Sequence, residues 1–275
     1  MRLSACTVVL TLVLTLVLQL VLQIAPGLSR GLYDRVRAYD TDRAYDTDTY
    51  GDITITPFTH SHIQLEHAGK VIHVDPWSVS DLSKARPADL ILITDDVGHH
   101  LDAKAIARVR KPGAPVVIAA NGRKVVPDGI VMANGDTREV AGITVEATPA
   151  YDVTPGESFH PKAEANGYIV TLGSRRIYVV GVTECVPEIR AAKNIDVAFF
   201  PMNLPAKRME PAAAIDCIAA FKPKVVYPYH YDQEWVRPVP SGGQRPRPTT
   251  RGLQDLVKAL TPSGIEVRLA DWYQP

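Results

Sequence analysis

The feature that most constrains how this chain can fold is a hydrophobic run that ends abruptly in acids and imidazoles, ILITDDVGHHLD at residues 91–102. An apolar run of this kind predicts a strand buried on both faces, and Asp102 is placed to cap a following helix. Acidic and imidazole side chains bunched where a buried strand meets a helix are typical of a metal or catalytic site. The alternative is an exposed polar loop in front of a helix cap.

The amino-terminal residues predict export. Met1 and Arg2 precede an almost uninterrupted apolar run over residues 5–25, and small residues follow it. A basic start, an apolar stretch and small residues describe a secretory signal, so we expect a periplasmic or extracellular protein. The alternative is an uncleaved membrane anchor, because about 20 apolar residues can span a bilayer. We assign residues 1–29 to this signal peptide or anchor.

The rest of the chain divides into a linker and one domain. The hexamer RAYDTD occurs twice in residues 37–48, and such a polar repeat cannot build a core. Residues 30–51 are therefore expected to be a linker, followed by a single domain over residues 52–275. Export would allow Cys185 and Cys217 to pair, although the sequence does not show whether they meet.

The charge balance limits the partners. The chain has 30 basic and 30 acidic side chains. Proteins that bind nucleic acid or anionic membranes carry a basic excess, so we expect neither partner. A small-molecule substrate or ligand is left, with membrane contact only through the amino-terminal segment.

Strands and helices alternate through the domain. β-Branched alternation and apolar runs predict strands at residues 53–56, 62–66, 70–75, 89–94, 116–119, 143–147, 168–172, 176–180, 196–200, 225–229 and 265–269. Helices are predicted at 102–109, 211–221 and 253–260. Runs of strands interrupted by helices that must cover a sheet face predict an α+β protein with two sheets between helical layers.

The strand-end segment resembles a known metal-binding signature. It is similar to the H-x-H-x-D-H motif of the metallo-β-lactamase-fold superfamily, in its branch of lactonase-like metal-dependent hydrolases. Aligned with that motif, the family's residue types are kept at Thr94, Asp96, His100, Leu101 and Asp102. Asp95 and Val97 stand at the positions of the two first histidines, and His99 at that of the aspartate. The motif is therefore degenerate.

Further segments carry the resemblance through most of the domain. They are Thr59-His60, Val74-Asp75-Pro76, Thr148–Asp152, Phe159–Lys162, Ile177–Glu184, Pro201–Leu204 and Pro228–Tyr231. Each is weak alone, but they occur in the family's order and spacing. The resemblance implies a single-domain αββα four-layer sandwich.

The resemblance also implies a metal site, in an altered form. In the family two metal ions activate a bridging water, but Val97 and Val182 cannot replace a ligand or the bridging carboxylate. Two adjacent dications without a bridging anion repel strongly. We therefore expect one divalent ion, preferably zinc, held by His100 and His230 with His99 or Asp95 completing the set. Asp96 is the candidate general base.

Other polar residues are expected near this site. The resemblance implies five neighbours, Asp152, Glu184, His160, Lys162 and Asn203, of which His160 and Lys162 are expected to shape the pocket mouth. Four early histidines, at positions 60, 62, 67 and 73, are interpreted mostly as structural or exposed. The Arg-rich segment 235–251 is interpreted as a flexible loop, although its arginines could meet an anionic group.

Two functions remain open. The first is an exported hydrolase in which a metal-activated water attacks an ester, lactone, amide or phosphoester bond; His100, His230 and Asp96 favour it. The second is a non-catalytic relative that binds a small ligand or a protein. The replaced ligand positions favour this second interpretation.

Overall fold

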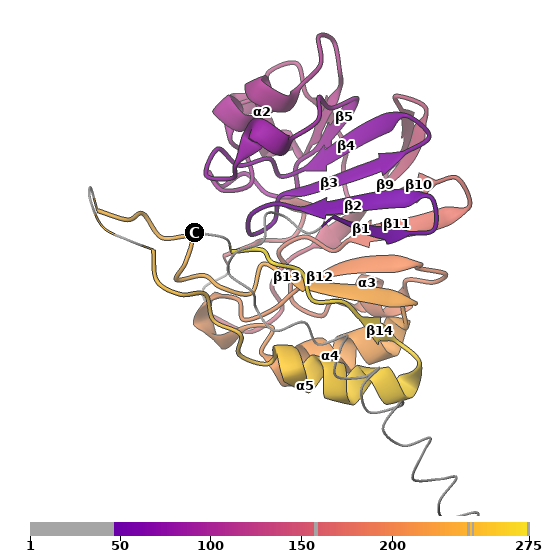
Figure 1. The fold of residues 1–275 in the computed structure, drawn as a ribbon, viewed down its shortest axis with the longest axis vertical. Helices are drawn as coiled ribbons and strands as arrows, with labels where there is room; N and C mark the ends of the chain where they lie inside the picture. Colours follow the sequence, from indigo (N-terminus) through magenta and orange to yellow (C-terminus); the bar gives the residue numbers. More distant parts are fainter. Residues whose placement is uncertain (1–46, 157–158, 241–242, 244, 274–275) are drawn as a thin grey trace, which may run out of the picture. The chain divides into compact units, whose positions relative to one another are not determined.

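A computed structural model of the chain describes residues 47–156, 159–240, 243 and 245–273. The described residues form two seven-stranded sheets (Figure 1). The first sheet contains β1 (Asp48–Tyr50), β2 (Ile53–Pro57), β3 (Ile63–His67), β4 (Lys70–Val74), β5 (Leu90–Leu92), β6 (Val116–Ile118) and β7 (Ile130–Val131), in that order. Its strands pair antiparallel from β1 to β4 and parallel from β4 to β7.

The second sheet follows the same plan. It contains β8 (Thr137–Val140), β9 (Ile143–Ala150), β10 (Ala165–Leu172), β11 (Arg175–Val179), β12 (Val197–Pro201), β13 (Val225–Tyr229) and β14 (Glu266–Val267). Strands β8 to β11 pair antiparallel and β11 to β14 pair parallel. Both sheets are therefore mixed, and each has a parallel half whose strand ends meet at one edge.

Helices cover the sheets. They are α2 (Ala103–Val109), α3 (Pro187–Ala191), α4 (Pro211–Phe221) and α5 (Leu253–Leu260). Figure 1 shows α2 beside the first sheet and α4 and α5 beside the second. This confirms the α+β fold with two sheets between helical layers.

The strand in front of the polar segment is buried on both faces. Leu90 and Leu92 of β5 belong to the large core that includes residues of both sheets. Ile91 and Ile93 face the other way, into a smaller core with Ile106 of α2. Because side chains alternate along a strand, one continuous apolar run serves both cores, as the sequence predicts.

The predicted elements are found close to their expected bounds, with four additions. Strands β7 and β8 and helix α3 are short and were not predicted. Strand β1 pairs with β2 and lies inside the segment expected to be a linker, so the sheet begins before residue 52. The signal or anchor and the linker up to residue 46 lie outside the described residues. Among the described helices, none is both long and apolar enough to cross a membrane.

The two cysteines of the domain are joined. Cys185 and Cys217 form a disulfide, with 5.7 Å between their Cα atoms. Cys217 lies on the buried face of α4, and Cys185 lies just before α3. The bond therefore ties the segment after β11 to the helical layer.

Candidate metal centre

Four imidazoles converge at the strand ends. His60, His99, His100 and His230 each offer a ring nitrogen, and these atoms all lie within 4.8 Å of one another. We call these four residues the imidazole cluster. They come from the β2–β3 turn, the segment after β5 and the end of β13. Three of the rings are buried and His99 is partly exposed.

Unusual backbone conformations place two of these rings. His60 has φ of 62° and His230 has φ of 51°, in the left-handed region that residues other than glycine seldom adopt. The two turns hold each other, since the backbone N–H of His230 donates to the carbonyl of His60. Such conformations persist where the surrounding structure enforces them, often at functional sites.

A buried carboxylate orients His100. Its Nδ1 lies 2.7 Å from Oδ2 of Asp75, and both side chains are fully buried. Asp75 also accepts hydrogen bonds from the backbone N–H and the hydroxyl of Thr94, at 2.7 and 2.6 Å. Donation from Nδ1–H to this carboxylate leaves the lone pair of Nε2 free to bind a metal. A carboxylate behind a histidine is a common support for metal ligands.

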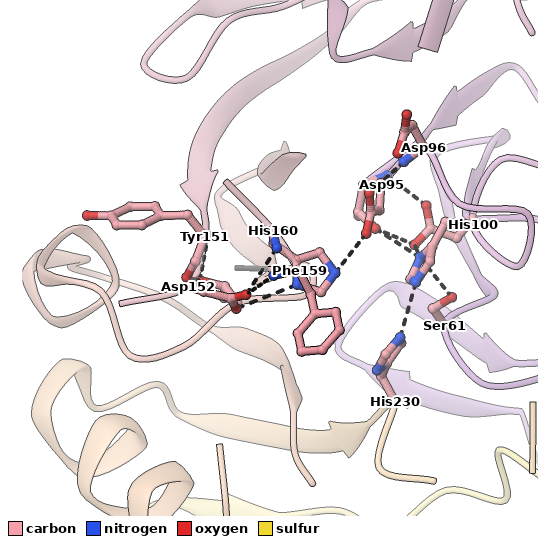
Figure 2. A network of polar contacts seen from close by, with 12 residues as sticks. Ser61, Asp95, Asp96, His100, Tyr151, Asp152, Phe159, His160 and His230 are labelled. Carbon is pink, nitrogen blue, oxygen red and sulfur yellow. Dashed lines mark hydrogen bonds and ion pairs between the residues drawn. The ribbon is translucent and has the colours of Figure 1, made fainter. Parts of the chain in front are cut away.

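His230 faces His100 across the cluster. Their Nε2 atoms are 3.1 Å apart (Figure 2). Behind His230, the side-chain amide of Gln233 contacts the ring, with 2.9 Å between the amide nitrogen and Nδ1. Two nitrogens that share a tetrahedral zinc ion lie roughly 3.3 Å apart, given Zn–N bonds of about 2.0–2.1 Å. The spacing of the two rings therefore fits shared coordination of one ion.

His60 presents a buried nitrogen without a hydrogen bond. Its Nδ1 contacts the hydroxyl of Tyr273 at 2.9 Å, whereas its Nε2 is buried and has no hydrogen-bond partner among the described residues. The ring lies 3.8 Å from that of His230, centroid to centroid. Buried polar atoms are nearly always paired, so this nitrogen is suited to a ligand that the protein does not itself provide.

The electrostatics keep His60, His99 and His230 neutral. Burial, reinforced by the neighbouring imidazoles, lowers the pKa of His60 and of His230 well below its usual value. Burial and then His100 lower the pKa of His99 to about 3. Neutral imidazole is the form that binds metals. The cluster could thus hold a metal ion through nitrogen ligands.

The structure brings together three of the four expected ligands. His99, His100 and His230 belong to the imidazole cluster, but Asp95 does not. The Oδ2 atom of Asp95 instead lies 3.1 Å from Nε2 of His160. The fourth member of the cluster is His60.

Asp96, the candidate general base, has a different neighbour. Its carboxylate lies 2.5 Å from Nζ of Lys124, and its side chain is 24 % exposed. Figure 2 shows it beyond Asp95 on the side away from His230. Its catalytic role therefore stays a prediction.

Three of the expected neighbours lie together beside the cluster. His160 has its Nδ1 atom 3.5 Å from Oδ1 of Asp152. Glu184 accepts hydrogen bonds from the backbone N–H groups of Val153 and Thr154, at 2.5 and 2.6 Å, and so holds the segment that follows Asp152.

The two remaining neighbours make other contacts. Lys162 lies at the surface, 3.1 Å from Oε1 of Glu188. Asn203 donates to the carbonyl of Arg251 at 3.1 Å and accepts from the Arg251 guanidinium at 2.8 Å. Neither contact joins the imidazole cluster.

The segment after His230 reaches the cluster from outside. The guanidinium of Arg245 lies 4.4 Å from the ring of Trp235 and 5.8 Å from that of Trp77, and Trp77 lies 6.0 Å from His99. Arg251 pairs with Glu210 at 2.6 Å. Both arginines therefore contact other residues of the protein. The sequence had instead led us to expect a flexible, solvated loop.

The early histidines differ from one another. His62 and His73 are buried and share a hydrogen bond of 2.9 Å, and His73 also donates to the carbonyl of Arg86 at 2.8 Å. His67 pairs with Asp52 near the surface. His60 is the exception to the expectation for this group, because it belongs to the imidazole cluster. In the sequence, only the position of His60 shortly after a strand indicates that it could belong to the site. The same kind of position identified the other three histidines.

Comparison with known proteins agrees with this site. A protein from Aeropyrum pernix named UPF0173 metal-dependent hydrolase is 25 % identical over 205 residues, covering 64 % of this chain and 81 % of its own length. A crystal structure from Parabacteroides distasonis, provisionally described as a metal-dependent hydrolase, is 36 % identical with a TM-score of 0.72 and covers 82 % of this chain and 99 % of its own.

A more distant structure shares the fold. Igni18, a metallo hydrolase from Ignicoccus hospitalis, is 21 % identical with a TM-score of 0.60, covering 79 % of this chain and 94 % of its own. The profile of the β-lactamase superfamily domain matches residues 54–230, which include the whole imidazole cluster. The chain is a member of the β-lactamase superfamily and has the metallo-β-lactamase fold.

Proposed function

We propose that this protein is an exported hydrolase that uses one divalent metal ion, held by the imidazole cluster, to cleave an ester, lactone, amide or phosphoester bond. When bound, such an ion acts as a Lewis acid and lowers the pKa of a coordinated water. Zinc is the preferred ion because imidazoles suit it, and three of the four imidazoles are enough to hold it while the fourth coordination position binds water. The names of the relatives, metal-dependent hydrolases, support the same reaction class.

One observation carries the proposal. Ring nitrogens from three separate chain segments meet within 4.8 Å, and one of them, Nε2 of His60, is buried without a hydrogen bond. A purely structural histidine would use both of its ring nitrogens, as His73 does. The unpaired nitrogen of His60, which faces three other imidazoles, is best explained by a ligand at the centre of the cluster.

The other residues of the site hold the ligands in place. Asp75 fixes the tautomer of His100, Gln233 contacts His230, and Tyr273 contacts His60. Ligands orientated by such contacts lose less freedom when they bind an ion. For Asp96 to act as general base, its carboxylate would have to exchange Lys124 for a water.

That pairing favours a second candidate, a non-catalytic binding module. The Asp96–Lys124 contact and the absence of a ligand side chain at Val97 and Val182 would be expected of a protein that keeps the fold but has lost the reaction. The two candidates differ in whether the bound ion supports turnover.

Two observations support export. The amino-terminal sequence has the pattern of a secretory signal. The Cys185–Cys217 disulfide is of a kind that persists mainly in oxidising compartments. Localising the protein by cell fractionation would test this part of the proposal.

The test of the reaction uses protein expressed from the full sequence, loaded in turn with zinc, manganese and nickel. Generic esters, lactones and phosphodiesters are screened for hydrolysis, and metal content is measured by elemental analysis. We expect stoichiometric metal and a turnover that His230→Ala abolishes while His67→Ala, near the surface, does not. Metal without turnover across the panel would favour the binding module, and a protein that binds no metal would overturn both the metal site and the hydrolase.

A further inference from the structure

A second group of charged residues lies beside the imidazole cluster. The ring of His160 lies between two carboxylates, with Nε2 3.1 Å from Asp95 and Nδ1 3.5 Å from Asp152 (Figure 2). The carboxylate-bearing side chains are only 7 % and 1 % exposed, and the imidazole is 13 % exposed. Asp95 follows β5 and Asp152 follows β9, so the ring connects the two sheets.

A further ion pair completes this group. Nε of Arg208 lies 3.8 Å from Asp152 and 3.9 Å from Glu184. We call these five residues the ion cluster: Asp95, Asp152, Glu184, His160 and Arg208. With His160 protonated it contains three acids and two cations.

The charges of the cluster support one another. Burial disfavours the charged ring of His160, but the neighbouring carboxylates of Asp95 and Asp152 outweigh burial and raise the pKa of His160. Burial likewise opposes ionisation of Asp95, yet His160 lowers the pKa of that carboxyl to about 2. Buried carboxylates need such a cation, because an unpaired buried charge is very costly.

The ion cluster lies where a second metal ion would be expected. Asp95 stands where the motif that this chain resembles has its first histidine, and Asp152 is one of the neighbours that the resemblance implies. The two missing ligand positions are unsuitable, since Val97 points to solvent with 40 % exposure and Val182 is packed in the core. A dinuclear centre therefore does not fit these residues.

We propose that His160 is a built-in cation that takes the place of a second metal ion and so limits this site to one ion. The proposal rests on the proposed function and explains how the protein can keep buried carboxylates without a second metal. Both ring nitrogens face carboxylates, so His160 supplies charge but directs no N–H group at a substrate. Any Lewis acid chemistry then belongs to the imidazole cluster alone.

The proposal predicts that removing the ring opens a cation site. In His160→Ala, Asp95 and Asp152 lose their shared cation, and carboxylates are good ligands for manganese. We expect this variant to bind one more Mn²⁺ per chain than the wild type, measured by equilibrium dialysis with elemental analysis. Electron paramagnetic resonance should then show coupling between two nearby Mn²⁺ ions.

Three variants separate charge from shape. His160→Lys restores a cation between the carboxylates, so its stoichiometry should match the wild type. His160→Asn keeps a polar side chain without charge and should gain the extra ion, which keeps the test informative if the alanine variant does not fold. Adding Asp152→Asn to His160→Ala should remove the gained ion.

The chain also offers a matched control. His67 lies 3.1 Å from Asp52, the same spacing as between His160 and Asp95, but Asp52 is 64 % exposed. His67→Ala should therefore gain no ion. A folded His160→Ala or His160→Asn protein without the extra ion, or a wild type that binds two ions, would overturn the inference. A wild-type protein that binds no metal ion would instead contradict the proposed function. The further inference would not be affected, because it concerns only the ion gained when His160 is replaced.

Discussion

The imidazole cluster and the ion cluster are neighbours with opposite electrostatics. The first contains four imidazoles, and Nε2 of His60 there has no hydrogen bond. The second also contains buried carboxylate atoms without a hydrogen bond, Oδ2 of Asp95 and Oδ1 of Asp152, but its acids face the cations His160 and Arg208. A metal ion can therefore replace only weak contacts in the first group, whereas it would have to displace ion pairs in the second. Both groups lie at strand ends, but the balance of charge within each group determines whether it can bind a metal ion.

The largest expected effect comes from removing a ring of the imidazole cluster. His100→Ala deletes a proposed ligand and leaves the buried carboxylate of Asp75 without its 2.7 Å partner. We expect zinc affinity to fall by more than about 100-fold, since even residues behind a ligand contribute about 10- to 100-fold. Zinc affinity is measured by competition with a chelating dye.

The matched change in the ion cluster sharpens this result. His160→Ala should leave the first zinc ion bound about as tightly as in the wild type. Equal losses of affinity in the two variants would mean that the groups act as one site. Unchanged affinity in His100→Ala would place the metal elsewhere.

The next effect concerns stability near the ion cluster. Cys185 follows Glu184 directly, and its bond to Cys217 closes a loop with a sequence separation of 32. Replacing both cysteines by serine should destabilise the fold by about 3–4 kcal/mol, which lowers Tm by roughly 10 °C in a domain of this size. Thermal unfolding followed by circular dichroism measures this change.

The same variant tests whether the two groups are independent. The disulfide has no member of the imidazole cluster next to it in sequence, so zinc affinity of the folded variant should not change. A stability loss accompanied by weaker zinc binding would show that the helical layer also supports the imidazoles. Wild-type protein treated with a reductant provides the control.

The fold could be predicted from sequence because it depends on repeated local patterns. In the run at residues 89–94, the four central positions are all apolar. The structure places Leu90 and Leu92 in one core and Ile91 and Ile93 in the other. The short strands β7 and β8 were not predicted, because two to four residues are too few to show the alternation of apolar and polar side chains. Pairing with a neighbour, not local sequence, makes them strands.

The candidate site was only partly predictable. His99, His100 and His230 could be selected because each follows a predicted strand, and His230 also lies in a motif that resembles the family. His60 lies in a hairpin whose ring direction depends on its left-handed backbone and on contacts with the carboxyl-terminal residues. Tertiary contacts of this kind leave no local pattern. The pairing of Asp95 with His160 depends on a loop 65 positions further along the chain, for the same reason.

A smaller effect is expected behind the ligands. Asp75→Asn keeps the shape but removes the charge that faces Nδ1 of His100. Because an amide also accepts hydrogen bonds less strongly than a carboxylate, we expect zinc affinity to fall about 10- to 100-fold. The measurement is again chelator competition, with Asp52→Asn, the partner of His67, as the control. An unaffected affinity would show that Asp75 only fills the core.

The smallest expected effect belongs to Tyr273, a positioning residue for His60. Its hydroxyl contacts Nδ1 of His60 at 2.9 Å and accepts the backbone N–H of Asp232 at 2.9 Å. Tyr273→Phe removes about one hydrogen bond behind the ring, worth roughly 1 kcal/mol, so zinc affinity should fall about fivefold. Tyr50→Phe, outside the site, should leave it unchanged.

A double-mutant cycle shows whether Tyr273 acts through His60. Residues that act through one another have non-additive effects. In a His60→Ala background, Tyr273→Phe should therefore change zinc affinity no further, although it still removes the contact with Asp232. An equal loss in both backgrounds would show that Tyr273 supports the segment after His230 rather than His60. Because His60 is the ring with the unpaired nitrogen, the cycle also tests whether that ring contacts the ion.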